Sequence, residues 1–189
     1  MSIFDRLNNN AGAAAGDSAK PAEGEFTFVF DRLPESGDEM KALPEASLDT
    51  PYKTAALTLC ALCAYAAAPD IGKDMLNFLK GPQPLSQYEI SFLNDRFRDG
   101  KHIPFSYFEG AVPENNYTPS KPFTVRIFSN PYSFQNEGWA TLHLRSGGAD
   151  SPRQIKLRLK PSEGKWYLSE QMIMVGIRPA KQDDVWAYS

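Results

Sequence analysis

The stretch SLDTPYKTAALTLCALCAYAAAPD, residues 47–70, decides the fold of this chain. Its most apolar part, residues 55–68, is shorter than the ~20 apolar residues that a membrane-spanning helix needs, and it has the length of a buried core helix. Asp49 or Thr50 is a suitable N-cap, and Pro69 is a suitable stop. The stretch therefore predicts a buried, alanine-rich helix and no membrane span.

Two cysteines, Cys60 and Cys63, form a C-x-x-C pair within this helix. A redox pair of this kind lies at a helix N-terminus, where the dipole lowers the thiol pKa, whereas Cys60 lies well inside the helix. A zinc site needs two more ligands, and the two histidines of the chain, His102 and His143, are distant in sequence. We therefore expect structural thiols, no metal and no cofactor, with thiol chemistry as the lesser alternative.

The composition is that of a mostly globular, slightly acidic chain. It has 189 residues, of which 42% are hydrophobic, and a formal net charge of -3. A domain that binds nucleic acid normally carries a basic excess, so we expect no nucleic-acid partner. Residues 1–24 are small, polar and of low complexity, which predicts a flexible tail ahead of a single domain over residues 25–189. The opening MSIFDRLNNN has no apolar signal-peptide core, so we expect a cytoplasmic protein.

Helix signals continue after the first stretch and then change to strand signals. Asp70 can cap a second helix that runs to Lys80, and Ser86 with Glu89 makes a capping box for a third. The apolar stripe of the third helix consists of Tyr88, Phe92, Leu93 and Phe97. Residues 34–47 have the composition of a polar loop. Alternating apolar residues predict strands at residues 25–33, 102–108, 123–129, 138–146, 153–160 and 165–177.

This order of elements predicts the α+β class, with about three N-terminal helices packed on a C-terminal antiparallel meander of five to six strands. Helices ahead of a twisted meander that ends in GKWYLSEQ resemble the cystatin-like or nuclear-transport-factor-2-like cone. That resemblance implies a bent sheet with helices on its concave face, and a flatter helix-on-sheet sandwich is the alternative.

A second resemblance rests on three segments: DMLNFLKGPQPLS, IPFSYFEGAVPENNYTPSKPF, and GWATLHLRSGG through KWYLSEQMIMVGIRP. Together they are similar to an uncharacterised family of small bacterial proteins, a domain of unknown function, over residues 25–189. The resemblance implies a bacterial cytoplasmic protein and brings no catalytic residues with it.

The expected strand at residues 138–146 carries the candidate for catalysis. Alternation places on one of its faces Trp139, Thr141, His143 and Arg145. A histidine beside a cavity can act as a general acid or base, so a small cone-fold enzyme of hydrolase or isomerase type that uses His143 is the alternative function. No orienting carboxylate or nucleophile can be identified beside it. The short motifs of nucleotide-binding, zinc-protease and serine-hydrolase enzymes are absent.

Two aromatic-rich loops, GAVPENNYTPSKP and NPYSFQNEGW, are the favoured binding surface, because aromatic side chains on loops held by a rigid scaffold are common in recognition. The candidate binding residues are Tyr117, Tyr132, Phe134, Trp139 and Arg145. A row of Lys156, Arg158 and Lys160 indicates either a solvated sheet face or a contact for an acidic partner. The main hypothesis is therefore a non-catalytic domain that binds a protein partner or a small ligand.

Overall fold

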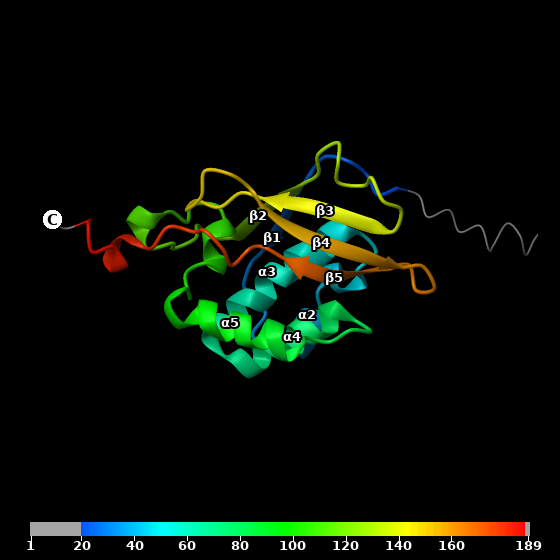
Figure 1. Ribbon diagram of the computed structural model, residues 1–189, viewed down its shortest axis with the longest axis horizontal. Helices are drawn as coiled ribbons and strands as arrows, with labels where there is room; N and C mark the ends of the chain where they lie inside the picture. Colours follow the sequence, from blue (N-terminus) through cyan, green and yellow to red (C-terminus); the bar gives the residue numbers. More distant parts are fainter. Residues whose placement is uncertain (1–19, 188–189) are drawn as a thin grey trace, which may run out of the picture.

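The computed structural model describes residues 20–187, which form one antiparallel sheet with helices packed on a single face of it (Figure 1). The helices and strands are, in chain order, β1 (Glu25–Phe30), α2 (Gly37–Lys41), α3 (Pro51–Ala67), α4 (Pro69–Lys80), α5 (Gln87–Asp99), β2 (Phe123–Phe128), β3 (Trp139–Leu144), β4 (Arg153–Lys160) and β5 (Lys165–Gln171). The helices come before four of the strands, so the predicted α+β class is confirmed.

The five strands of the sheet are paired in chain order, which makes the sheet a meander as predicted. Neighbouring strands run antiparallel, and the Phe-rich strand β1 pairs with β2, with Glu25 opposite Phe128. Alternate residues of β3 and β4, such as Leu142 and Ile155, are fully buried against the helices. Strands β1 and β5 are therefore the edges of the sheet, and β5 is the edge nearer to α4 (Figure 1).

Helix α3 lies against the sheet, contacts β2 to β5 and is buried along almost its whole length. The predicted N-cap is Thr50, whose hydroxyl accepts a hydrogen bond from the Lys53 N–H at 3.3 Å. Deeper in the helix, Thr54 Oγ1 donates to the Trp166 carbonyl at 2.6 Å and so joins α3 to β5. None of the helices within residues 20–187 has both the length and the apolar character that crossing a bilayer requires.

Helices α4 and α5 lie on the side of α3 away from β3 (Figure 1). Helix α3 ends at Ala67 and α4 begins at Pro69, so the predicted stop is confirmed. Gly72 allows the two helices to approach closely, since a Cβ at this position would lie 2.4 Å from Tyr65 Cα. The alanine-rich sequence and one glycine therefore set the distance between these helices.

The start of α5 is the predicted capping box. Ser86 Oγ accepts from the Glu89 N–H at 3.2 Å, and Glu89 Oε2 accepts from the Ser86 N–H at 2.8 Å. Farther along α5, the Phe97 ring stacks on the Tyr65 ring of α3 with 4.9 Å between centroids. The Tyr65 hydroxyl also donates to Asn94, so α5 is fixed on α3 at several points.

Two sequence predictions about strands are wrong. Residues 102–108 do not form a strand but contain the 3-10 helix Pro104–Tyr107. Pro104 has no N–H for a strand ladder, and the Tyr107 hydroxyl donates to the Ile173 carbonyl at 2.6 Å, which holds this segment against the core. Strand β5 ends at Gln171, six residues before the predicted end, because the Gln171 side chain accepts from the Ile173 N–H at 2.8 Å and the chain leaves the ladder.

Two predictions about helices also need correction. The expected loop at residues 34–47 contains helix α2, whose N-cap is Ser36, and the 3-10 helix Pro44–Ser47. Helix α4 begins at Pro69 rather than after Asp70, so Asp70 lies in the first turn instead of capping it. The second difference is a boundary shift of one or two residues, which is common at helix ends, whereas the first is a short helix that the polar composition of the segment concealed.

The boundary between a tail at residues 1–24 and a domain at residues 25–189 stays a prediction, because residues 1–19, 188 and 189 lie outside the described range. The chain is attached to the sheet and α3 just before β1. Tyr52 Oη donates to the Ala22 carbonyl at 2.7 Å, and the Gly24 N–H donates to Ser129 Oγ at 2.9 Å.

Candidate functional site

Cys60 and Cys63 are both free thiols and both buried, as the sequence predicts. Burial raises the pKa of the Cys60 thiol and that of the Cys63 thiol far above the ordinary value. Burial therefore disfavours the thiolate form of both cysteines, which is the form that redox chemistry and metal binding require. Across residues 20–187, no three side chains of His, Cys, Asp and Glu are grouped closely enough to hold a metal ion.

His143 is buried beneath the loop that joins β2 to β3. Its Nε2 lies 3.0 Å from Asn130 Nδ2, and its ring lies 5.4 Å from the Phe128 ring. Burial lowers the pKa of His143 below its ordinary value. The ring of His143 is hydrogen-bonded to the Asn130 amide. Among the described neighbours, no carboxylate forms a hydrogen bond with the ring and could orient it for an acid/base role.

The five candidate binding residues do not gather at one site. Tyr117 is buried, with its hydroxyl donating to the Arg178 carbonyl at 2.6 Å and its ring stacked on His102. Phe134 and Trp139 line a small cavity of about 210 Å³ near the start of β5. Tyr132 is exposed on the loop between β2 and β3.

Arg145 follows β3 and is exposed on the face of the sheet opposite α3. Its guanidinium lies 4.0 Å from the Phe128 ring centroid and pairs with Glu25 at 2.8 Å. The structure therefore brings Arg145 close to His143 through Phe128, and it separates both from Tyr117.

A mainly apolar concavity lies elsewhere, between α5 and the end of β5, and has a volume of about 330 Å³. We call it the α5–β5 groove. Its lining residues come from α3, α4, α5, β5 and the segments next to them: Leu62, Leu76, Leu85, Tyr88, Glu89, Phe92, Leu93, Leu168, Ser169, Glu170, Gln171, Met172 and Val175.

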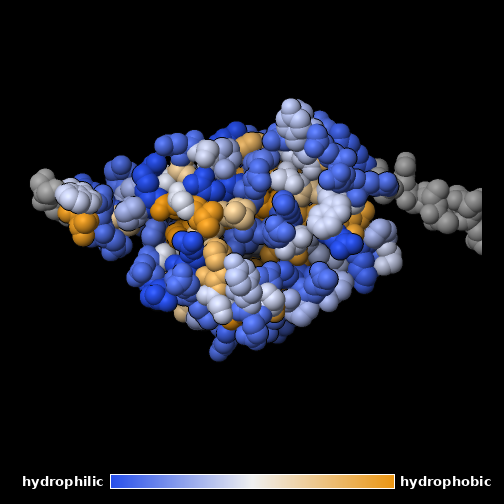
Figure 2. Space-filling model, viewed as in Figure 1, coloured by the Kyte–Doolittle hydropathy of each residue, from blue (hydrophilic) through white to orange (hydrophobic). Residues whose placement is uncertain are grey.

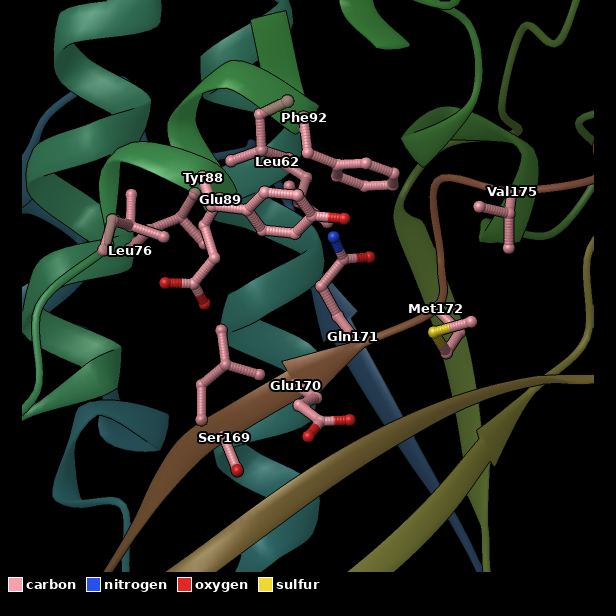
Figure 3. Close-up of a pocket in the computed structure, with 13 residues that line it drawn as sticks. Leu62, Leu76, Tyr88, Glu89, Phe92, Ser169, Glu170, Gln171, Met172 and Val175 are labelled. Carbon is pink, nitrogen blue, oxygen red and sulfur yellow. The ribbon is translucent and has the colours of Figure 1, made fainter. Parts of the chain in front are cut away.

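The floor of the α5–β5 groove is apolar and its rim is exposed. Leu62, Leu93 and Leu168 form buried parts of the wall. At the opening, Tyr88 is 80% exposed and Met172 is 50% exposed. Figure 2 shows apolar side chains at the surface between α5 and the chain that follows β5. In Figure 3 the Tyr88 ring and the Gln171 amide extend toward each other across the opening.

An ion pair between a buried lysine and a partly exposed glutamate holds α5 to the sheet, and its glutamate lines the groove. Lys80, buried at the end of α4, donates to Glu89 of α5 and, at 3.3 Å, to the Ser169 carbonyl of β5. Burial alone would raise the pKa of the Glu89 carboxyl, but hydrogen bonds from Lys80 and Ser86 outweigh burial and hold the pKa below its ordinary value. These contacts join the end of α4 to α5 and to the edge strand β5.

Sequence patterns alone do not predict this groove, although one signal in α5 points to it. Tyr88 belongs to the apolar stripe of α5, yet the core ends at Leu93 and Phe97 and leaves Tyr88 outside. The run of Met172 to Val175 continues the apolar sequence beyond the end of β5. An apolar stripe longer than the core it covers is the pattern that could have indicated an unfilled site.

Comparison with known families matches residues 32–181 to one family model, described as Domain of unknown function (DUF6935). The match contains all the residues that line the α5–β5 groove, and it covers most of the range over which the resemblance was expected. Comparison with curated proteins and with solved structures finds no match, so the cone shape of the sheet stays a prediction. The chain therefore belongs to the family Domain of unknown function (DUF6935).

Proposed function

We propose that this protein is a non-catalytic binding domain that holds a small, neutral, largely apolar molecule in the α5–β5 groove. The observation that carries the proposal is an apolar concavity of about 330 Å³ with Tyr88 and Met172 exposed at its opening. Ligand pockets in proteins have volumes of about 300–1,000 Å³ and are lined mainly by apolar side chains with a few polar groups. Exposed large apolar side chains gathered at one place are typical of binding sites.

The charges at the groove favour a neutral ligand. The two carboxylates that line it already have cations within the protein: Glu89 pairs with Lys80, and Glu170 lies 3.6 Å from Lys156. A charged group placed on the leucine floor would lose its hydration without gaining a counterion. Gln171 and the Tyr88 hydroxyl at the opening can each form a hydrogen bond that orients one polar end of the ligand.

A bacterial cytoplasmic location is part of this proposal. Cys60 and Cys63 remain free thiols inside the core, which is the usual state of cysteines in a reducing compartment. Their burial makes the fold independent of disulfide formation.

The test is binding of Nile red, a neutral apolar dye whose fluorescence rises in an apolar site. The Met172→Lys variant places a charge at the opening, and we expect its affinity for the dye to fall at least about tenfold, because the ammonium group would have to be desolvated beside the ligand. The matched control is Val29→Lys on β1, where the replaced residue is 52% exposed, close to the 50% of Met172.

The control variant should bind the dye as the unchanged protein does. Thermal melting of both variants checks that they are folded. Absence of saturable dye binding by the unchanged protein, or equal binding by Met172→Lys and Val29→Lys, would refute the proposal.

A further inference from the structure

The face of the sheet turned away from α3 carries a local excess of positive charge. The outward residues of β3 and β4 are Trp139, Thr141, His143, Gln154, Lys156, Arg158 and Lys160. They include three cations and no carboxylate, and the exposed Arg145 follows directly after β3. Three carboxylates of neighbouring segments, Glu25, Glu163 and Glu170, pair with Arg145, Lys160 and Lys156, so the excess is one positive charge and is centred on Arg158. This contrasts with the net charge of -3 of the whole chain. No described helix covers this face (Figure 1).

Arg158 and Trp139 form the centre of this surface. They lie directly opposite each other on β4 and β3, and the guanidinium is 5.0 Å from the indole ring centroid. Both side chains are exposed, with Trp139 at 38%. Within residues 20–187, no ion pair joins a carboxylate to Arg158, so its charge is available to a partner while its ring contact holds it in position.

The other cations of this surface are held only by solvent-exposed pairs. Lys156 lies 3.6 Å from Glu170, Arg145 lies 2.8 Å from Glu25, and Lys160 pairs with Glu163 in the turn after β4; all six side chains are exposed to solvent by a third or more. Exposed pairs of this kind contribute only about 0–1 kcal/mol each, so a partner carboxylate can replace the internal one at little cost.

The spacing of the cations along β4 indicates the shape of the partner. Lys156, Arg158 and Lys160 occupy alternate positions of one strand, so neighbouring cations are separated by roughly 6.5–7 Å along it. Carboxylates at every second position of an extended peptide repeat at the same distance. We infer that this face of the sheet docks an extended acidic segment of a partner protein, with carboxylates on the β4 cations and an apolar side chain on Trp139. This surface goes beyond ligand binding in the α5–β5 groove.

A polypeptide fits this surface better than a nucleic acid does. A strand of phosphates carries one charge per nucleotide and is normally bound by a domain with a clear basic excess. Here the basic row is short and the chain as a whole is acidic. An acidic peptide has a lower charge density and can also present apolar groups to the indole ring.

The experiment measures fluorescence anisotropy of a labelled peptide in which glutamate and serine alternate, at low ionic strength, with the full-length protein. We expect saturable binding that weakens as salt is added, and a rise in Kd of at least about tenfold in Arg158→Glu. The control Lys73→Glu makes the same charge change on α4, where Lys73 pairs with the exposed Asp70, and its Kd should stay within about twofold.

The variant Arg158→Gln removes the charge without reversing it, and it replaces Arg158→Glu if melting shows that the latter is unfolded. Equal rises in the peptide Kd for Arg158→Glu and Lys73→Glu would overturn the inference, because they would indicate unspecific attraction between the peptide and any positive charge of the protein. Tighter binding of an oligothymidylate than of the peptide would overturn it in favour of nucleic acid. Absence of saturable peptide binding would also overturn it, whatever the result for Nile red.

Discussion

At Cys60 and Cys63, the position of the residue in the fold controls the chemistry of the side chain. Both sulfur atoms are enclosed by the core between α3 and its neighbours, and burial raises the pKa of each thiol. The sequence distance of three residues, which resembles a redox motif, only reflects that both cysteines lie on a packed helix surface.

These thiols should react only when the protein unfolds. With a thiol reagent such as dithionitrobenzoate at neutral pH, we expect modification of the native protein to be at least about a thousandfold slower than that of the denatured chain, because opening the core costs several kcal/mol. Absorbance at the wavelength of the released dye measures the rate. Rapid reaction of Cys60 and Cys63 in the native state would show that α3 is accessible.

Gly72 is the second residue whose identity the packing requires. A Cβ at this position would lie 2.4 Å from both Cα and Cβ of Tyr65, so Gly72→Ala must push α4 away from α3. We expect the free energy of unfolding to fall by about 1–3 kcal/mol, even though alanine is the better helix former. Urea denaturation measures the change.

The matched control is Gly37→Ala in α2, where nothing lies within 4 Å of the added Cβ. There the higher helix propensity of alanine should keep stability equal or raise it slightly. Equal effects of the two substitutions would mean that the close contact between α3 and α4 is not required.

At the scale of elements, the Lys80–Glu89 pair joins α4, α5 and the edge strand β5. The Lys80 ammonium is buried and donates both to Glu89 and to the Ser169 carbonyl, so it depends on Glu89 for its counterion. Glu89 also lines the α5–β5 groove. Loss of the carboxylate should therefore affect both stability and ligand binding.

The substitution Glu89→Gln tests this role and retains the hydrogen bonds of the capping box. We expect the free energy of unfolding to fall by about 1–2 kcal/mol at neutral pH. This is less than the effect of breaking a fully buried ion pair, because Glu89 is partly exposed. Since the folded pKa of Glu89 is lowered, its contribution is present above the ordinary Glu pKa and is lost as the pH falls below about 4.5.

The difference between Glu89→Gln and the unchanged protein should therefore shrink in acid, as urea denaturation at several pH values can show. The control Glu163→Gln removes an exposed carboxylate that also pairs with a lysine, Lys160, and should change stability less than Glu89→Gln does, because solvent screens an exposed pair. A difference that is constant from neutral to acid pH would contradict the assigned role of the ion pair.

At the scale of the whole molecule, the half-buried His102 and the buried His143 make stability depend on pH. Burial lowers the pKa of His102 and that of His143. In the pH range just below the ordinary histidine pKa, the unfolded chain thus binds protons that the folded protein does not bind. The free energy of unfolding should accordingly fall as the pH drops from about 7.5 to about 5.5.

Chemical denaturation across that range measures the slope. A double variant, His102→Gln with His143→Gln, cannot take up these protons in either state and should show a shallower fall in stability over the same range. The carboxylates contribute equally to both proteins, so they cancel in the comparison. Parallel stability curves for the two proteins would contradict the prediction.

Sequence periodicity predicted those elements whose structure depends on residues close together in the chain. The capping box of Ser86 and Glu89, the stop at Pro69 and the alternation in β3 and β4 are all local patterns, and each is confirmed. Residues 102–108 have the same apolar character as a strand, but the buried hydrogen bond of Tyr107 to Ile173 places them against the core instead. That partner is distant in sequence, so no local pattern could reveal it.

The candidate site also has a part that the sequence determines and a part that only the tertiary structure decides. The composition of residues 47–70 was enough to decide that the cysteines lie in a packed helix, because volume and polarity alone determine burial there. The α5–β5 groove depends on where the core stops: Leu93 of α5 is covered, whereas Tyr88, five residues earlier, is not. Only the packing of α5 against the end of β5 decides this, since a cavity is the space that side chains from separate segments fail to fill.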